Sequence, residues 1–299
     1  MRNYTLNCIA AGIFTLITSL FTQNISAQVN PMLGMYYQNR YLVNPAYAGE
    51  KEDLTVNLAY KRDWTKVEGT PSSNNVTADY GFGKMGVGLS FNGDKDGLID
   101  IYRYYATYAY HLTTGESSSL SLGLSGGVTT ENINYGNLIG DGDDNEVAIY
   151  NDKGAQLDGD FGMYYTVKNF TLQGVLPNLR NFFNKDTQDG RVYTPTKFYS
   201  ALSYKYKFDT NSLEPMVTYR GVENYENIID AGLNASFLDD QFNLMGIYHS
   251  TKNVSLGLGF EIQKKYQLQL AYTSPLSGTL RKYSAGSVQV GFRLHLSTK

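Results

Sequence analysis

The chain has 299 residues, of which 42% are hydrophobic and 18% charged, and it is rich in Tyr (26) and Gly (30) but has one Cys. Its formal net charge of -3 gives no electrostatic reason to expect a nucleic-acid partner. Its mean hydropathy of -0.34 excludes a protein built from membrane-spanning helices, but not a transmembrane β-barrel, which alternates apolar and polar residues along each strand.

Residues 1–27 have the features of a secretory signal peptide. Arg2 supplies the positive charge, Ile9 to Phe21 form a largely apolar stretch, and the small residue Ala27 precedes an expected cleavage at Gln28. The alternative, a membrane anchor, would need about 20 apolar residues. Because Cys8 lies in this segment, the mature chain would have no Cys, which excludes disulfides, zinc–thiolate sites and cysteine nucleophiles.

Residues 28–52 lack the period of a strand. They include the run Asn44-Pro45-Ala46-Tyr47-Ala48-Gly49, in which Asn-Pro favours a turn. If a barrel follows, this segment either docks at its periplasmic mouth or folds into its lumen, and the sequence does not decide between the two.

Residues 53–299 alternate between apolar and polar side chains with a period of two. In Val254 to Ile262 every even position is apolar and every odd one small or polar, and Leu120 to Val128 alternate in the same way. This period predicts strands with one apolar face. Fourteen strands are expected, beginning near Leu54, Val76, Met85, Ile101, Leu120, Phe161, Phe170, Phe198, Leu213, Ile229, Phe242, Val254, Tyr266 and Val288.

The connections between these strands alternate between short turns and long loops. Lys168-Asn169 and Asp239-Asp240 are among the short ones, and 135–157 and 177–194 among the long ones. Outer-membrane barrels have this asymmetry, with the long loops outside the cell. The sequence therefore predicts an all-β outer-membrane antiparallel barrel. The alternative is a soluble β-sandwich, which would have to bury much of the Tyr surface that suits a membrane interface.

Several motifs resemble the PorP/SprF family of type IX secretion system membrane proteins. The first is Asn44 to Gly49, just after the signal peptide. Others follow in the family's order, and one departure occurs near the end, where Val288-Gln289 stand in place of a family His-Glu pair. The further matches are Trp64 with Gly69-Thr70-Pro71, Asn92 to Gly97, Tyr108-Ala109-Tyr110-His111 and Asp160-Phe161-Gly162.

The resemblance implies a non-enzymatic outer-membrane component without a cofactor, from a member of the Bacteroidota. Its implied partners are a secreted substrate or surface adhesin, which it would anchor or help present, and the periplasmic secretion and gliding machinery. The competing hypothesis from the residues is a passive outer-membrane channel or a transporter of hydrophobic solutes. It requires residues 28–50 to leave the lumen open.

The candidate catalytic and metal-binding residues can also be explained by structural roles. His111, His249 and His295 lie on the polar faces of their strands, so we expect them in luminal hydrogen-bond networks. A phospholipase would instead need Ser and His on the lipid side. The acidic run Asp141 to Glu146 departs from a calcium loop and is expected to be solvated, with calcium as the alternative.

Charged and aromatic residues suggest two further features. The lumen-facing charges Asp79, Arg103, Lys205, Arg220, Asp230, Glu261 and Arg293 have both signs and are expected to pair. The loop after Pro177 combines Arg180 with Phe182 and Phe183, residue types that are enriched at protein interfaces. It is either a surface for a partner protein or a loop that folds back and closes the mouth of the barrel, and the sequence does not separate the two. We expect Phe182 and Phe183 to contact a partner protein, together with the family-motif residues Asn44, Pro45, Ala46, Tyr47, Gly49 and Trp64.

Overall fold

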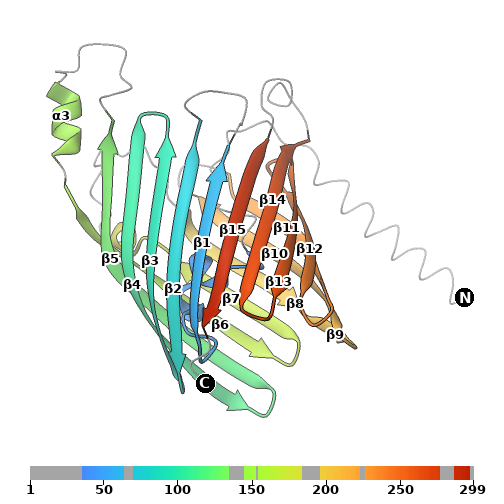
Figure 1. Cartoon of the computed structure of the whole chain (residues 1–299). Coiled ribbons are helices and arrows are strands. Elements are labelled where there is room, and N and C mark those ends of the chain that lie inside the picture. The colour runs from blue at the N-terminus through green and yellow to red at the C-terminus, as the bar shows by residue number, and fades with distance from the viewer. Residues whose placement is uncertain are drawn as a thin grey trace, which may run out of the picture.

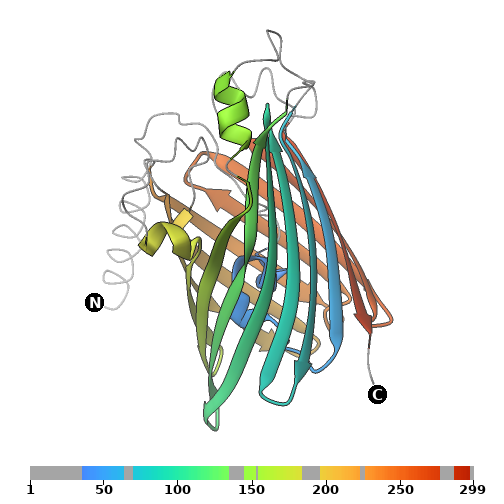
Figure 2. The same ribbon diagram turned by 90° about the vertical axis from the view of Figure 1, so that its left-hand side faces the viewer.

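The computed structural model describes residues 36–63, 70–134, 145–152, 154–183, 196–222, 226–276 and 286–296. They form a closed antiparallel β-barrel (Figures 1 and 2). Its strands are β1 (Leu54–Arg62), β2 (Ser72–Phe82), β3 (Met85–Asp96), β4 (Ile99–Gly115), β5 (Ser118–Ile133), β6 (Gln156–Val167), β7 (Phe170–Leu176), β8 (Thr196–Tyr204), β9 (Tyr206–Phe208), β10 (Asn211–Val222), β11 (Ile228–Phe237), β12 (Phe242–His249), β13 (Asn253–Ile262), β14 (Tyr266–Pro275) and β15 (Ser287–Leu296).

The ring closes where the first strand meets the last. β1 pairs with β15 from Leu54↔Leu296 to Arg62↔Val288, and β10 pairs with β11 on the opposite side. β9 continues the line of β8 and keeps the same register on β10. The break at Lys205 lies beside Pro215 of β10, which has no backbone N–H to give to the ladder. The architecture is thus fourteen strands with one short extra piece.

The barrel wall is apolar outside and polar inside. Large apolar side chains such as Leu89, Leu124 and Leu256 are exposed on the outer face. Buried polar side chains, among them Thr107 and Gln173, face inward. In water this outer surface would be unfavourable, whereas in a bilayer it contacts lipid tails at no such cost.

The predicted barrel and its strand number are confirmed. The strand starts agree closely except that β2 begins at Ser72 and β6 at Gln156, four and five residues earlier than expected. Both extensions lie at the end of the long loops, where polar residues such as Asn75 and Asp158 still pair along the ladder. The described helices include α2 (Arg40–Val43), the 3-10 turn η3 (Pro45–Tyr47), α3 (Asn145–Asn151) and α4 (Leu179–Phe183). None of the helices in the described ranges combines the length and apolar character of a bilayer-spanning segment.

Candidate functional site

Residues 36–50 lie inside the barrel, where they appear blue in Figures 1 and 2. We call this segment the plug. Its two short helical turns, α2 and η3, each begin at a capping Asn. The side chain of Asn39 accepts a hydrogen bond from the backbone of Leu42, and that of Asn44 from the backbone of Ala46. The Asn-Pro pair thus starts the second turn.

Polar bonds fix the plug to several sides of the wall. The Arg40 guanidinium donates to both carboxylate oxygens of Glu214 on β10, at 2.6 and 2.8 Å. Four further bonds reach other strands: Asn39 to Thr77 (3.1 Å), Tyr41 to Thr107 (2.8 Å), Asn44 to Gln173 (3.2 Å) and the Gly49 N–H to Asp79 (3.0 Å). Because these partners lie on β2, β4, β7 and β10, the plug crosses the lumen.

Glycines in the wall make room for the plug. A Cβ on Gly162 would lie 2.1 Å from the side-chain oxygen of Asn44, and one on Gly86 would lie 1.9 Å from the carbonyl oxygen of Ala48. At Gly123 a Cβ would come within 2.4 Å of the backbone of the η3 turn. All three distances are too short for real contacts, so the wall has the shape of the plug.

The family motif Asn44 to Gly49 lies inside the barrel as part of the plug. Asn44, Pro45, Ala46 and Tyr47 are all buried against the wall, and the Tyr47 ring stacks on Tyr164 of β6 at a centroid distance of 4.2 Å. Gly49 has φ +64, a conformation that favours glycine, where the chain turns toward β1. Burial raises the pKa of Tyr47 above the ordinary value of about 10, so its phenol stays neutral. The predicted contact Trp64 lies outside the described residues.

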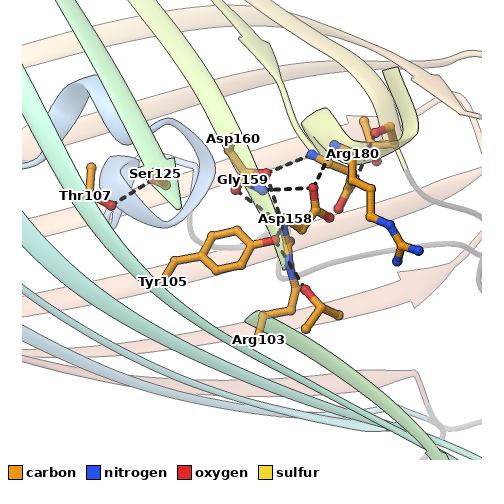
Figure 3. Close-up of polar contacts among 11 residues, drawn as sticks. Arg103, Tyr105, Thr107, Ser125, Asp158, Gly159, Asp160 and Arg180 are labelled. Carbon is orange, nitrogen blue, oxygen red and sulfur yellow. Dashed lines mark hydrogen bonds and ion pairs between the residues drawn. The ribbon is translucent and has the colours of Figure 1, made fainter. Parts of the chain in front are cut away.

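The helix α4 is fixed to β6 at the long-loop end of the barrel (Figure 3). The Asp158 carboxylate accepts the backbone N–H of Arg180 at 3.0 Å, and Asp160 accepts that of Asn178 at 2.8 Å. Asp160 is itself held by Arg103 of β4, at 3.0 Å. This arrangement leaves the predicted interface residues Phe182 and Phe183 62% and 75% exposed, with their rings edge to face.

A buried network of polar contacts on β10 to β13 contains three residues that the sequence placed in the lumen, His249, Arg220 and Asp230, although the sequence did not show that they meet. His249 lies with Nδ1 2.8 Å from Asp230 and Nε2 2.8 Å from Ser255, and Arg220 contacts the other oxygen of Asp230 at 3.3 Å. The order Ser–His–Asp is that of a hydrolase triad. Here Ser255 and His249 have no exposed surface, so a substrate has no path to the hydroxyl. These contacts instead link the four strands β10 to β13.

The other two histidines also contact luminal groups. The Nε2 of His111 lies 3.1 Å from the carbonyl oxygen of Ala48 in the plug, and the Nδ1 of His295 lies 3.0 Å from the hydroxyl of Thr55. Residues 141–144 of the acidic run lie outside the described residues. Over the ranges that are described, no three His, Cys, Asp or Glu side chains are grouped to hold a metal ion.

Among solved structures, the barrel is similar to CymD, a monoaromatic hydrocarbon channel, with a TM-score of 0.54 and 10% identity over 86% of this chain and 92% of that one. It is also similar to the Pseudomonas putida toluene transporter TodX (TM-score 0.49, 10% identity, 88% of this chain and 95% of that one) and to Omp33 of Acinetobacter baumannii (TM-score 0.46, 7% identity, 82% and 99%). The likeness to CymD shows the barrel fold. A comparison with curated proteins returned no match.

The family comparison covers both the plug and the wall. The chain matches the family described as type IX secretion system membrane protein PorP/SprF over residues 25–294. The match includes the Asn44 to Gly49 run of the plug, the strands and the loop that carries α4. The expected resemblance is thereby confirmed: the chain belongs to the PorP/SprF family of type IX secretion system membrane proteins.

Proposed function

We propose that the protein is a non-enzymatic outer-membrane scaffold of the type IX secretion system. In this role it anchors a secreted protein or adhesin at the cell surface or helps to present it there. Family membership supports a place in the secretion system, and the apolar outer face of the barrel supports a place among outer-membrane lipids.

The plug across the lumen is the observation that carries this proposal. The plug is bonded to strands on several sides of the wall and packs against glycines that have no room for another residue. A scaffold needs a rigid barrel and two accessible ends but no open pore. A conduit, by contrast, would have to break these contacts at each passage.

The aromatic pair on α4 is the proposed contact with the surface partner. Phe182 and Phe183 are strongly exposed although α4 is fixed to β6 through backbone hydrogen bonds. Exposed aromatic side chains on a rigid support contribute strongly to protein binding, because little conformational freedom is lost on association. The long-loop end of a barrel faces the cell exterior.

The remaining parts of the proposal concern export and source. Residues 1–27 would be removed on export, and the short-turn end would meet the periplasmic secretion or gliding machinery. The family resemblance also favours a member of the Bacteroidota as the source. No enzymatic activity is proposed, because the one Ser–His–Asp arrangement among the described residues is closed to substrate.

Complementation of a gene deletion tests the scaffold function. Surface display of the secreted partner should be lost in the deletion strain and restored by the native gene. The F182A/F183A variant should restore it poorly, while the control Y206A/F208A, which removes two exposed aromatic residues at the short-turn end, should restore it fully. Normal surface display of the secreted partner in the deletion strain would refute the proposal.

A passive channel or hydrophobic-solute transporter is the rival function. The similar protein CymD carries the description of a monoaromatic hydrocarbon channel, but at 10% identity this likeness extends to the fold alone. Planar-bilayer recordings on the purified protein separate the two functions. Steady conductance through the native barrel would favour the channel, and a closed barrel would favour the scaffold.

A further inference from the structure

A mainly apolar groove lies on the outer face of the barrel beside α4. Its volume is about 620 Å³, and it is lined by residues 106–108 of β4, 124–126 of β5 and 157–159 of β6, together with Leu179 and Arg180 of α4. This volume lies within the roughly 300–1,000 Å³ of typical small-molecule sites. We call this feature the outer groove.

Small residues form the floor of the outer groove. Ala106 on β4 pairs with Gly126 on β5, and Gly126 pairs with Gly159 on β6, so the three lie side by side on one face of the wall. The next pair on that face, Tyr108 and Leu124, carries large side chains that are 49% and 56% exposed. The floor therefore lies below a rim of large apolar side chains.

The packing of the protein does not require a glycine at the centre of this floor. A Cβ on Gly126 would have no other described residue within 4 Å beyond its chain neighbours, whereas one on Gly123 of the same strand would overlap the plug. Gly159 is required by the wall itself, because its Cβ would lie 2.4 Å from the Ser125 carbonyl oxygen. Glycine weakens a strand interior and often marks a place that a ligand approaches closely. Gly126 is thus the position that an occupant would explain.

The polar groups next to the floor already have hydrogen-bond partners (Figure 3). Thr107 and Ser125 are buried, and their hydroxyls lie 2.7 Å apart. The Asp158 carboxylate accepts the backbone N–H of Arg180 at 3.0 Å, and the Arg180 guanidinium donates to Gln156. A polar ligand in the groove would therefore lose its hydrogen bonds to water without replacing them, so the groove favours an apolar occupant.

The position of the outer groove on the barrel indicates which apolar occupant is at hand. The groove opens between exposed side chains of the lipid-facing wall, at the long-loop end where α4 lies. The long loops face the cell exterior, so the surroundings of the groove are the lipid tails of the outer leaflet. Water is unstable in an apolar hollow because it needs several polar partners, and an empty hollow loses the dispersion contacts that an occupant would make.

We propose that the outer groove binds one acyl chain of an outer-leaflet lipid. The chain lies over Ala106 and Gly126, between the side chains of Leu124 and Leu157, and it contacts Leu179 of α4. The contacts are made by the chain, so they do not depend on the head group of the lipid. This site holds a lipid and not the secreted partner, so it goes beyond the surface role proposed above and does not depend on it.

Native mass spectrometry on the purified full-length mature protein in detergent tests this site. The probe is dipalmitoyl phosphatidylethanolamine, and dihexanoyl phosphatidylethanolamine, with the same head group and much shorter chains, is its control. We expect the native protein to retain one long-chain lipid and no short-chain lipid. Gly126→Leu fills the groove and should weaken retention about tenfold, the loss expected when about two methylene groups leave apolar contact. Ala106→Leu on the neighbouring strand should act in the same way, and it provides the test if G126L does not fold.

The matched control is Gly246→Leu. Gly246 on β12 pairs with Leu256, which is 61% exposed, so this glycine also faces the lipid, but it does not line the outer groove. Retention by G246L within about twofold of native, together with weaker retention by a groove variant of native heat stability, supports the site. Equal retention by the native protein and the groove variants, equal retention of both probes, or no retained lipid in the native protein would each overturn it.

Discussion

Breaking the ion pair between Arg40 and Glu214 should release the plug from the wall. In the R40A variant the Glu214 carboxylate, whose side chain is 5% exposed, loses the guanidinium that donates two hydrogen bonds to it. Breaking a buried ion pair costs about 3–5 kcal/mol, and we take the lower end because the Arg40 side chain keeps 28% of its exposure. About 3 kcal/mol corresponds to a roughly 100-fold larger population of the displaced plug.

A single thiol in the plug reports this population. Val43 packs against the buried residues inside the barrel, and the only native cysteine, Cys8, lies in the predicted signal peptide. The V43C thiol should therefore react slowly with maleimide in the native barrel and about 100-fold faster when R40A is added, because labelling follows the displaced fraction.

The double variant R40A/E214A is the control for this experiment. It removes the uncompensated carboxylate together with its partner, so labelling should fall back toward the native rate. If R40A and native barrels of equal heat stability label at the same rate, the ion pair does not hold the plug and the reasoning is wrong.

Two further predictions, one of them with a control variant, test separate parts of the structure. Gly162→Val should displace the plug and speed V43C labelling, because the new side chain would overlap Asn44. Gly246→Val is the control: its Cβ would lie 3.7 Å from the nearest side chain, so labelling should stay unchanged. Asp158→Ala removes the acceptor of the Arg180 N–H, a hydrogen bond of about 1–2 kcal/mol. Hydrogen exchange at that amide should therefore rise about tenfold. An unchanged exchange rate would contradict the role of this contact in fixing α4.

The strands could be predicted from the sequence because their signal is local. A residue such as Leu256 shows by its neighbours alone that it faces away from Ser255, and the bilayer requires this alternation over every strand. The break between β8 and β9 was not predicted, since it depends on Pro215, a residue of the next strand. Such a break appears only when the register is known.

The interior could not be predicted in the same way. Whether the Asn44 to Gly49 run entered the lumen depended on Gly162, Gly123 and Gly86 lying opposite it, on strands far apart in the sequence. The alignment of Asp230 with His249 likewise follows from the pairing of β11 with β12. These contacts join positions that no sequence period relates, so only the folded barrel brings them together.

The plug is covalently joined to the barrel wall through the short segment before β1, and this changes what could displace it from the lumen. Only residues 50–53 separate Gly49 from the first residue of β1. A ligand on so short a tether acts at a local concentration on the order of millimolar or more. A free peptide competing for the same contacts at micromolar concentration would therefore lose to the plug, even with equal intrinsic affinity. Opening the lumen thus requires a change in the wall or the tether, and simple competition cannot achieve it.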